Sequence, residues 1–170
     1  MNLQWMEHKL HRHLSTALIL IAAITLGGAY AAEYIYNLEP CTLCLYQRIP
    51  FALIGFLGVI GYIFDSDKSK IFIAVLASLI FFAGSGVATY HVGVEQHWWA
   101  STTICGEGAP EQELSMKKFQ ALLQKKPAVA CDDLTWSFVG VSMATFNASF
   151  SGFLGLSALW TAHRIRCLSW

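Results

Sequence analysis

The stretch "IFIAVLASLIFFAGSGVATYHVGV", residues 71–94, contains no Asp, Glu, Lys or Arg. A helix rises about 1.5 Å per residue, so this stretch is long enough to cross a hydrocarbon core of roughly 30 Å. The rest of the chain is similar, because 55% of the 170 residues are hydrophobic and only 13% are charged. Soluble domains carry about 25% charged residues. The sequence therefore predicts a membrane protein, and its net charge of +0 gives no reason to expect a nucleic-acid partner.

Apolar stretches of this kind recur along the chain. Together they predict an all-α membrane protein with four transmembrane helices, near residues 14–33, 46–64, 71–92 and 136–162. The first stretch is too long for a cleavable signal peptide, and further spans follow it. We expect one domain over residues 1–170, a four-helix transmembrane bundle with outer loops near 34–45 and 93–135.

An even number of spans places both chain ends on one side of the membrane. The predicted inner segments carry six Lys and Arg, namely Lys9, Arg12, Lys68, Lys70, Arg164 and Arg166, against five on the other side, namely Arg48, Lys117, Lys118, Lys125 and Lys126. This small excess favours cytoplasmic termini. The five cysteines favour the same orientation, which puts Cys41, Cys44, Cys105 and Cys131 outside. The outer side is oxidising, whereas Cys167 is left in the reducing cytoplasm.

The long outer loop has two features typical of a membrane border. Trp98, Trp99 and Trp136 lie where the third span ends and the fourth begins, as aromatic belts do. Within "LSMKKFQALLQKKP", residues 114–127, apolar residues fall near one helical face and lysine pairs flank them. This pattern predicts a short helix in the membrane interface. A solvated amphipathic helix docked on other parts of the protein is the alternative.

The segment "EPCTLCLYQR", residues 39–48, contains the chemistry. Cysteines at i and i+3 share one helical face, and Pro40 suits the first turn of a helix. Amide protons at a helix N-terminus lower the pKa of a thiol, so this C-x-x-C predicts a reactive dithiol. A zinc site needs four ligands, commonly two such pairs, so no metal is expected. For Cys105 and Cys131, a purely structural disulfide remains an alternative.

Arg48 lies one helical turn after Cys44. A guanidinium is costly at the membrane border unless it reaches water, a headgroup or a functional anion. It could stabilise a Cys44 thiolate, donate to a carbonyl oxygen of a lipid-soluble acceptor, or act as an interfacial anchor. Pro50 must either kink this helix or mark a second helix start.

These features together predict an electron route. A disulfide of Cys105 and Cys131 in the loop would accept electrons from an outside dithiol protein. Thiol–disulfide exchange would pass them to Cys41 and Cys44. That pair needs a two-electron acceptor in the lipid phase, and a membrane quinone fits this requirement.

"PCTLCLYQR", "YHVGVEQHWW" and "CDDLTWSFVGVSMATFNA" resemble the disulfide bond formation protein B (DsbB) family over nearly the whole chain. The family consists of bacterial inner-membrane oxidases that re-oxidise the periplasmic oxidase DsbA, and its fold is a four-helix membrane bundle. The resemblance implies a DsbA-like thioredoxin-fold partner, and ubiquinone or menaquinone as acceptor.

The same resemblance implies a role for each site residue. Cys105 would form the mixed disulfide with the partner, and Cys131 would then exchange with Cys41. Cys44 would be the thiolate facing the quinone ring, with Arg48 on the quinone oxygen and His91 nearby. Cys167 has no role in this scheme, and we expect it to be a free thiol.

Two other functions are consistent with four spans. In a haem-bearing quinol cytochrome, His91 and His163 would have to ligate one iron, but they lie about a membrane thickness apart. In a non-enzymatic four-span membrane protein, disulfides would only staple the outer loops, which requires neither the C-x-x-C nor Arg48. Outside the dithiol we expect Asn147 to form an interhelical hydrogen bond. We expect Glu95 and His97 to be solvated loop residues.

Overall fold

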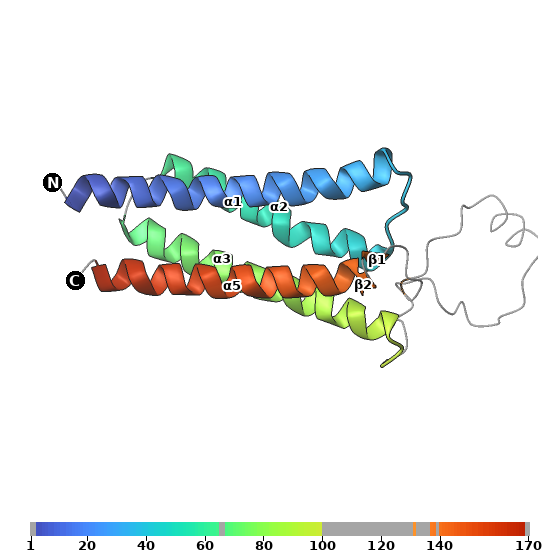
Figure 1. Ribbon diagram of the computed structural model, residues 1–170. Helices are drawn as coiled ribbons and strands as arrows, with labels where there is room; N and C mark the ends of the chain where they lie inside the picture. Colours follow the sequence, from blue (N-terminus) through green and yellow to red (C-terminus); the bar gives the residue numbers. More distant parts are fainter. Residues whose placement is uncertain (1–2, 65–66, 100–130, 132–136, 139, 169–170) are drawn as a thin grey trace, which may run out of the picture.

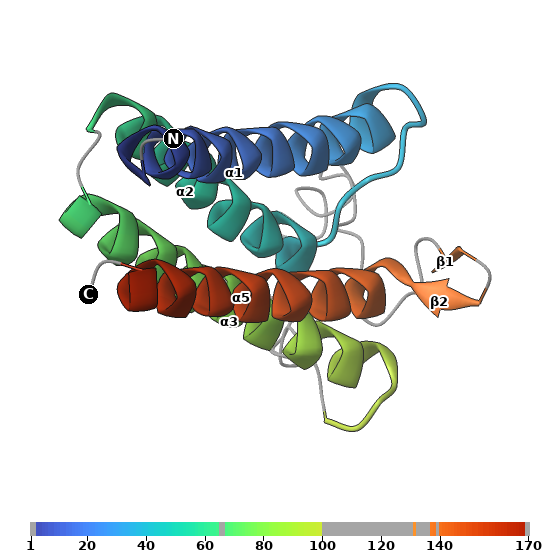
Figure 2. The ribbon, with the colours of Figure 1, turned by 60° about the vertical axis from the view of Figure 1, so that its left-hand side comes forward.

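The computed structural model describes residues 3–64, 67–99, 131, 137–138 and 140–168. The described helices are α1 (Leu3–Tyr34), α2 (Thr42–Ile63), α3 (Asp67–Glu95) and α5 (Met143–Leu168), and β1 (Ser137–Phe138) and β2 (Val141–Ser142) form a hairpin. The helices pack as an elongated bundle with both chain ends at one end and the hairpin at the other (Figures 1 and 2). The predicted interfacial helix of residues 114–126 lies outside the described residues.

Three of the helices are long and apolar enough to cross a membrane, over His13–Tyr34, Thr42–Ile63 and Ser69–Glu95. These spans confirm helices at the first three predicted positions. The fourth helix, α5, has 26 residues and runs beside α3 for the length of the bundle (Figure 1), but it contains no stretch as apolar as the three candidate spans. The fold is therefore an all-α membrane protein with three candidate spans and a fourth helix of matching length.

The predicted start of the fourth helix at residue 136 is wrong, because a short hairpin comes first. Its two strands pair antiparallel, with Ser137 opposite Ser142 and Phe138 opposite Val141. Gly140, in the connecting turn, has a φ of +79°, a conformation that glycine adopts without steric cost. Helix α5 begins only at Met143, after Ser142, whose Oγ accepts the amide hydrogen of Thr145 at 3.1 Å.

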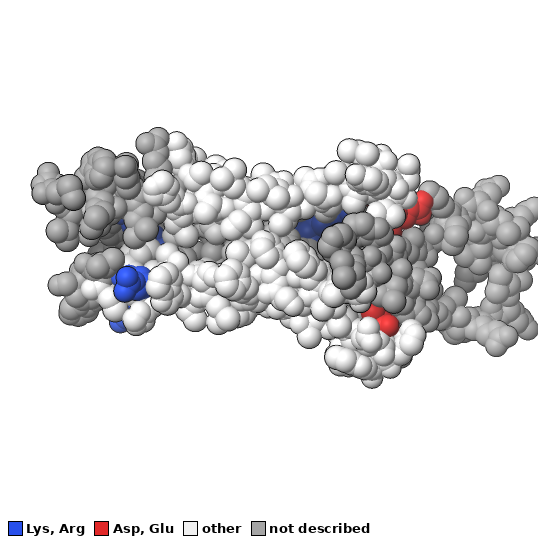
Figure 3. Space-filling view, viewed as in Figure 1, with Lys and Arg blue, Asp and Glu red and all other residues white. Residues whose placement is uncertain are grey.

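The surface of the bundle is apolar and its interior is partly polar, the reverse of a soluble domain. Ile24, Phe56, Phe72 and Phe153 are each at least 66% exposed. In Figure 3, the middle of the face is white, and charged side chains gather toward the two ends. Large apolar side chains exposed on all four helices indicate contact with lipid.

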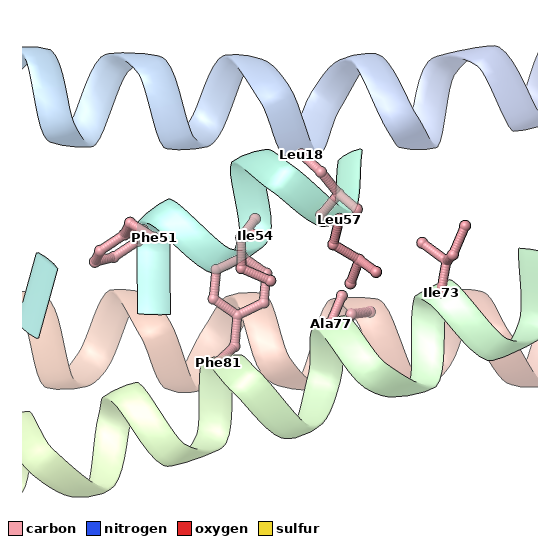
Figure 4. Close-up of a cluster of buried hydrophobic side chains, with 8 residues drawn as sticks. Leu18, Phe51, Ile54, Leu57, Ile73, Ala77 and Phe81 are labelled. Carbon is pink, nitrogen blue, oxygen red and sulfur yellow. The ribbon is translucent and has the colours of Figure 1, made fainter. Parts of the chain in front are cut away.

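Apolar side chains from all four helices meet in the middle of the bundle (Figure 4). This cluster consists of Leu18, Phe51, Ile54, Leu57, Ile73, Ala77, Phe81 and Ala158. Helix α2 runs without a break through Pro50. Pro50 therefore does not mark the start of a second helix.

Helices α1 and α2 approach each other closely at Gly58. A Cβ on Gly58 would lie 3.1 Å from the Ser15 carbonyl oxygen and 3.1 Å from the Ile19 nitrogen. The backbones of α1 and α2 therefore touch at this point, as small residues allow in lipid. At Gly27 and Gly28, farther along α1, an added Cβ would have nothing within 4 Å.

Candidate functional site

The C-x-x-C pair lies at the N-terminus of α2, at the hairpin end of the bundle. Cys41 is the N-cap residue of the helix, and its Sγ accepts the amide hydrogen of Cys44 at 3.3 Å. The two Sγ atoms are 2.7 Å apart, and both cysteines are free thiols. The predicted spacing therefore brings the sulfurs together, although the helix begins after Pro40 rather than with it.

The neighbours of Cys41 lower the pKa of its thiol. The pKa of Cys41 is lowered from 9.0 to about 4, chiefly by the hydrogen bond between its sulfur and that of Cys44. Burial opposes this shift, while the His91 ring and the Cys44 amide support it. Cys41 is only 2% exposed and precedes the apolar span. The reactive dithiol predicted from the sequence thus has a stabilised sulfur anion at its first cysteine.

His91 reaches this pair from α3. Its ring is 4% exposed, and Nε2 lies 3.6 Å from the Cys41 sulfur. The other ring nitrogen, Nδ1, lies 2.8 Å from Nε2 of Gln47. Both ring nitrogens therefore have a partner from α2.

Glu95 also belongs to the site, and the prediction that it is a solvated loop residue is wrong. Helix α3 continues to this residue, and the side chain is 7% exposed. Its Oε1 lies 3.7 Å from Nε2 of His91, while Oε2 is buried and has no hydrogen-bond partner among the described residues. His97, two residues later, is exposed as predicted.

Cys131 brings a third sulfur to the same end of the bundle. It is disulfide-bonded and fully buried. It packs in one apolar cluster with Cys41, Leu43 and Val94, and Cys44 lies against that cluster. Cys105, its predicted partner, lies outside the described residues. The structure thus brings together three of the four cysteines predicted to react.

Arg48 contacts α1. It donates to Glu33 at 2.6 Å, and its guanidinium lies 4.9 Å from the centre of the Tyr30 ring. The side chain remains 16% exposed. Its described contacts thus connect two helices beside the dithiol, and none of them is with Cys44.

Sequence reasoning missed a set of buried polar side chains behind His91. Gln47 is 7% exposed and accepts a hydrogen bond from Asn147 of α5 at 2.5 Å. Asn147 in turn accepts from Ser151 at 3.2 Å. The expected interhelical hydrogen bond of Asn147 is therefore confirmed. The only signal in the sequence was the i, i+4 spacing of Asn147 and Ser151, and other Ser and Thr residues in the same helix obscure it.

Cys167 lies at the far end of α5 and does not contribute to the site. It is exposed and free, as expected, with its sulfur 3.9 Å from the His163 ring.

The donor atoms of Cys41, Cys44 and His91 lie within 4.8 Å of one another, so they could surround a thiophilic metal ion. The same three groups also make a redox-active dithiol with an imidazole beside it. The neighbouring disulfide of Cys131 favours the redox use, because a metal site has no need of it.

Comparisons with known proteins support this interpretation. Residues 11–161 match the family described as "Disulfide bond formation protein DsbB". A disulfide bond formation protein B of Acinetobacter baumannii is 27% identical over 158 residues, which cover 91% of this chain and 92% of that protein. A protein of the same name from Xylella fastidiosa (strain Temecula1) is 30% identical over 114 residues, covering 65% of this chain and 66% of that protein.

An uncharacterised protein of Rickettsia prowazekii is 26% identical over 148 residues, which cover 86% of this chain and 85% of that protein. No solved structure matches the chain. The match to the family extends over nearly all of the bundle, including the C-x-x-C and Cys131. The chain therefore belongs to the disulfide bond formation protein DsbB family.

Proposed function

We propose that this protein re-oxidises a DsbA-like, thioredoxin-fold dithiol protein of the bacterial periplasm and passes the electrons to a membrane quinone. Membership of the family supports an oxidoreductase of disulfide bond formation in the membrane. The partner, the quinone and the orientation with both termini in the cytoplasm are parts of the proposal. The observation that carries it is the burial of disulfide-bonded Cys131 in one cluster with Cys41.

The proposed route begins at the loop. A thiolate of the reduced partner attacks the loop disulfide at Cys105, forms a mixed disulfide and releases Cys131 as a thiolate. The Cys131 thiolate attacks Cys41 of the oxidised C-x-x-C, and Cys44 leaves as a thiolate. Each step forms one S–S bond and breaks one.

Two further exchanges complete the transfer. The second thiol of the partner attacks the mixed disulfide, so the oxidised partner leaves and Cys105 is free. Cys105 then attacks Cys131 in its bond to Cys41, which re-forms the loop disulfide and releases Cys41. The C-x-x-C now holds two electrons from the partner. Free thiols at Cys41 and Cys44, with Cys131 disulfide-bonded, correspond to this stage.

The residues around the dithiol fit a quinone. Leu45 and Ile49 expose apolar side chains on the lipid side of α2, at 47% and 51%. Arg48 is partly exposed, and a guanidinium has five N–H donors, so the ion pair with Glu33 leaves donors for a carbonyl oxygen. A quinone, when bound, accepts two electrons and two protons and leaves as a quinol. Cys41 and Cys44 return to the disulfide in the same turnover.

A protein that used its disulfides only as staples would not need the rest of this site. A staple requires neither a free dithiol with one sulfur of lowered pKa nor a buried imidazole beside it. A purely structural role for the disulfides therefore leaves the arrangement at the N-terminus of α2 unexplained.

The test combines purified protein, a reduced thioredoxin-fold partner and a soluble quinone, and follows the quinone absorbance. We expect turnover in the native protein and a loss on the order of 1,000-fold or more in Cys44→Ser, because the variant cannot form the C-x-x-C disulfide. Cys167→Ser is the matched control and should keep the native rate, since that thiol lies at the other end of the bundle. Normal turnover by Cys44→Ser would end the proposal.

A further inference from the structure

The bundle buries a row of polar side chains that the exchange chemistry does not use. Gln47 is 7% exposed and Ser151 is 1% exposed, and both lie among apolar helices. Burial of an amide or hydroxyl costs free energy unless the group is hydrogen-bonded. Here each polar group bonds the next, and the row ends at the His91 ring beside Cys41.

The hydrogen bonds in this row have a direction. The Ser151 hydroxyl donates to Oδ1 of Asn147, so the amide NH₂ of Asn147 faces Oε1 of Gln47. The NH₂ of Gln47 is then the atom that faces Nδ1 of His91, at 2.8 Å. An amide has one accepting oxygen and one donating nitrogen, so each bond fixes the orientation of the next group. Nδ1 therefore accepts, and a neutral His91 ring carries its hydrogen on Nε2.

Only one other arrangement would satisfy every group, with all the bonds reversed. A single reversed amide would put two NH₂ groups or two oxygens face to face. With the whole row reversed, Nδ1 would carry the hydrogen, and Nε2 would offer a lone pair in a neutral ring or a second N–H in an imidazolium. The structure places the Gln47 NH₂ at Nδ1, which an imidazolium could not accept, so this direction requires a neutral ring. The surroundings of Nε2 favour the first direction, because the Cys41 sulfur lies at 3.6 Å and Oε1 of Glu95 at 3.7 Å. An N–H is attracted to both, whereas a lone pair would face two electron-rich atoms.

We propose that Gln47, Asn147 and Ser151 are positioning residues that hold His91 in its Nε2–H tautomer and direct that N–H at the Cys41 sulfur. The tautomer follows from the hydrogen bonds alone. Its effect on rate rests on the proposed function, in which Cys41 is attacked and later released as a thiolate. A fixed N–H donor stabilises that anion each time it leaves.

The inference also accounts for polar residues inside α5, which has no stretch as apolar as the three candidate spans. Asn147 and Ser151 are one helical turn apart and face α2, where Gln47 continues the row. A wholly apolar helix at this position would suit a membrane span better, but it could not form these hydrogen bonds. The polar residues Asn147 and Ser151 of α5 therefore lie where they connect to His91 through Gln47.

The direct test is nitrogen NMR of histidine-labelled, reduced protein in micelles, since protonated and unprotonated ring nitrogens have well-separated shifts. The His91 signals are those lost in His91→Asn. In the native protein we expect an unprotonated Nδ1 and a protonated Nε2. A protonated Nδ1 in the native protein would overturn the inference, whatever the variants do.

Variants at Gln47 sharpen the test. In Gln47→Glu, the carboxylate accepts from both neighbours, so Nδ1 should become protonated. In Gln47→Met, which has a similar length but no amide, both tautomers should appear. Ser149→Ala is the matched control, because among the described residues its exposed hydroxyl bonds only the Thr145 carbonyl oxygen of its own helix. An unchanged His91 spectrum in both Gln47 variants would contradict the proposed row.

Activity separates this inference from the proposed function. We expect Gln47→Met to lower kcat roughly 10-fold, the factor for losing one hydrogen bond to a charged group, with little change in the KM for quinone. A changed tautomer with an unchanged kcat would overturn the positioning role. If the native protein reduced no quinone at all, the proposed function would fail, and the NMR result would still decide the tautomer.

Discussion

Helices α2 and α5 begin at the same end of the bundle with the same spacing of capping side chains. Cys41 accepts the amide hydrogen of Cys44 at 3.3 Å, and Ser142 accepts that of Thr145 at 3.1 Å. The side chains within each pair also meet, at 2.7 Å between the sulfurs and at 3.0 Å between the oxygens. Both caps are buried, at 2% and 6% exposure.

The two helix starts differ in the capping atom and in what surrounds it. A hydroxyl stays neutral in water, so Ser142 satisfies an amide and does no more. A thiol can ionise, and Cys41 also has the His91 ring at 3.6 Å. One turn after each pair stand Arg48 on α2 and Ser149 on α5. The two helices thus share a capping arrangement, but only the start of α2 combines it with a thiol, an imidazole and a nearby cation.

The sharpest way to break the comparison is to measure the ionisation of Cys41. Its pKa is lowered from 9.0 to about 4, chiefly by the hydrogen bond between its sulfur and that of Cys44. Reduced protein should therefore react with iodoacetamide at Cys41 at nearly the same rate at about pH 8 and about pH 6, whereas an ordinary thiol slows about 100-fold. Mass spectrometry of the Cys41 peptide gives the rate. Burial slows the reaction at every pH, so the ratio is the readout.

The denatured protein is the control for this measurement, because its Cys41 should regain the steep pH dependence. The same shift affects stability. A pKa lowered on folding contributes stability that is complete above about pH 9 and is lost as the pH falls through about 4. A steep fall in the alkylation rate of the folded protein between about pH 8 and about pH 6 would show that α2 begins with an ordinary cap, as α5 does.

The second prediction concerns Arg48, because the equivalent position of α5 holds the uncharged Ser149. Arg48→Ala should raise the KM for quinone about 10-fold, because a lost hydrogen bond from a charged donor costs about 1.5–3 kcal/mol. The KM for the protein partner should not change. Ser149→Ala, at the equivalent position of α5, should change neither. Steady-state kinetics with each substrate varied in turn gives both values.

Arg48 also pairs with Glu33 at 2.6 Å, so a loss of helix packing must be excluded. Glu33→Gln keeps the cation and weakens the pair, and it should leave the KM for quinone near the native value. Equal increases in both KM values for Arg48→Ala would make this residue an anchor between α1 and α2.

The sequence predicted the helices and the dithiol because both depend on local patterns. Charge-free stretches set the spans, and the i, i+3 spacing set the meeting of Cys41 and Cys44. The hairpin before α5 was missed because the apolar, charge-free pattern continues through residues 136–142 and hides the turn at Gly140.

The rest of the site depends on packing between distant residues, which no local pattern records. Gln47 meets Asn147 across 100 positions of the chain, and Arg48 meets Glu33 across 15. Glu95 is the last residue of α3, and its charge suggested exposure, but the end of the helix is folded into the site. The row from Ser151 to His91 could be found only once three helices were placed side by side.

The smallest expected effect concerns Ser142, the residue that caps α5. Ser142→Ala removes a helix cap, so it should lower the free energy of unfolding in micelles by about 1 kcal/mol. Turnover with quinone should remain native, because Ser142 bonds only the start of its own helix in the described contacts. Cys41→Ser should show the opposite pattern, since its hydroxyl can still accept the Cys44 amide while the exchanging sulfur is gone. If Ser142→Ala stopped turnover instead, the start of α5 would belong to the reacting site, and the difference between the two helix starts would have to be sought in Thr145 and its neighbours on α5 rather than in the capping atom.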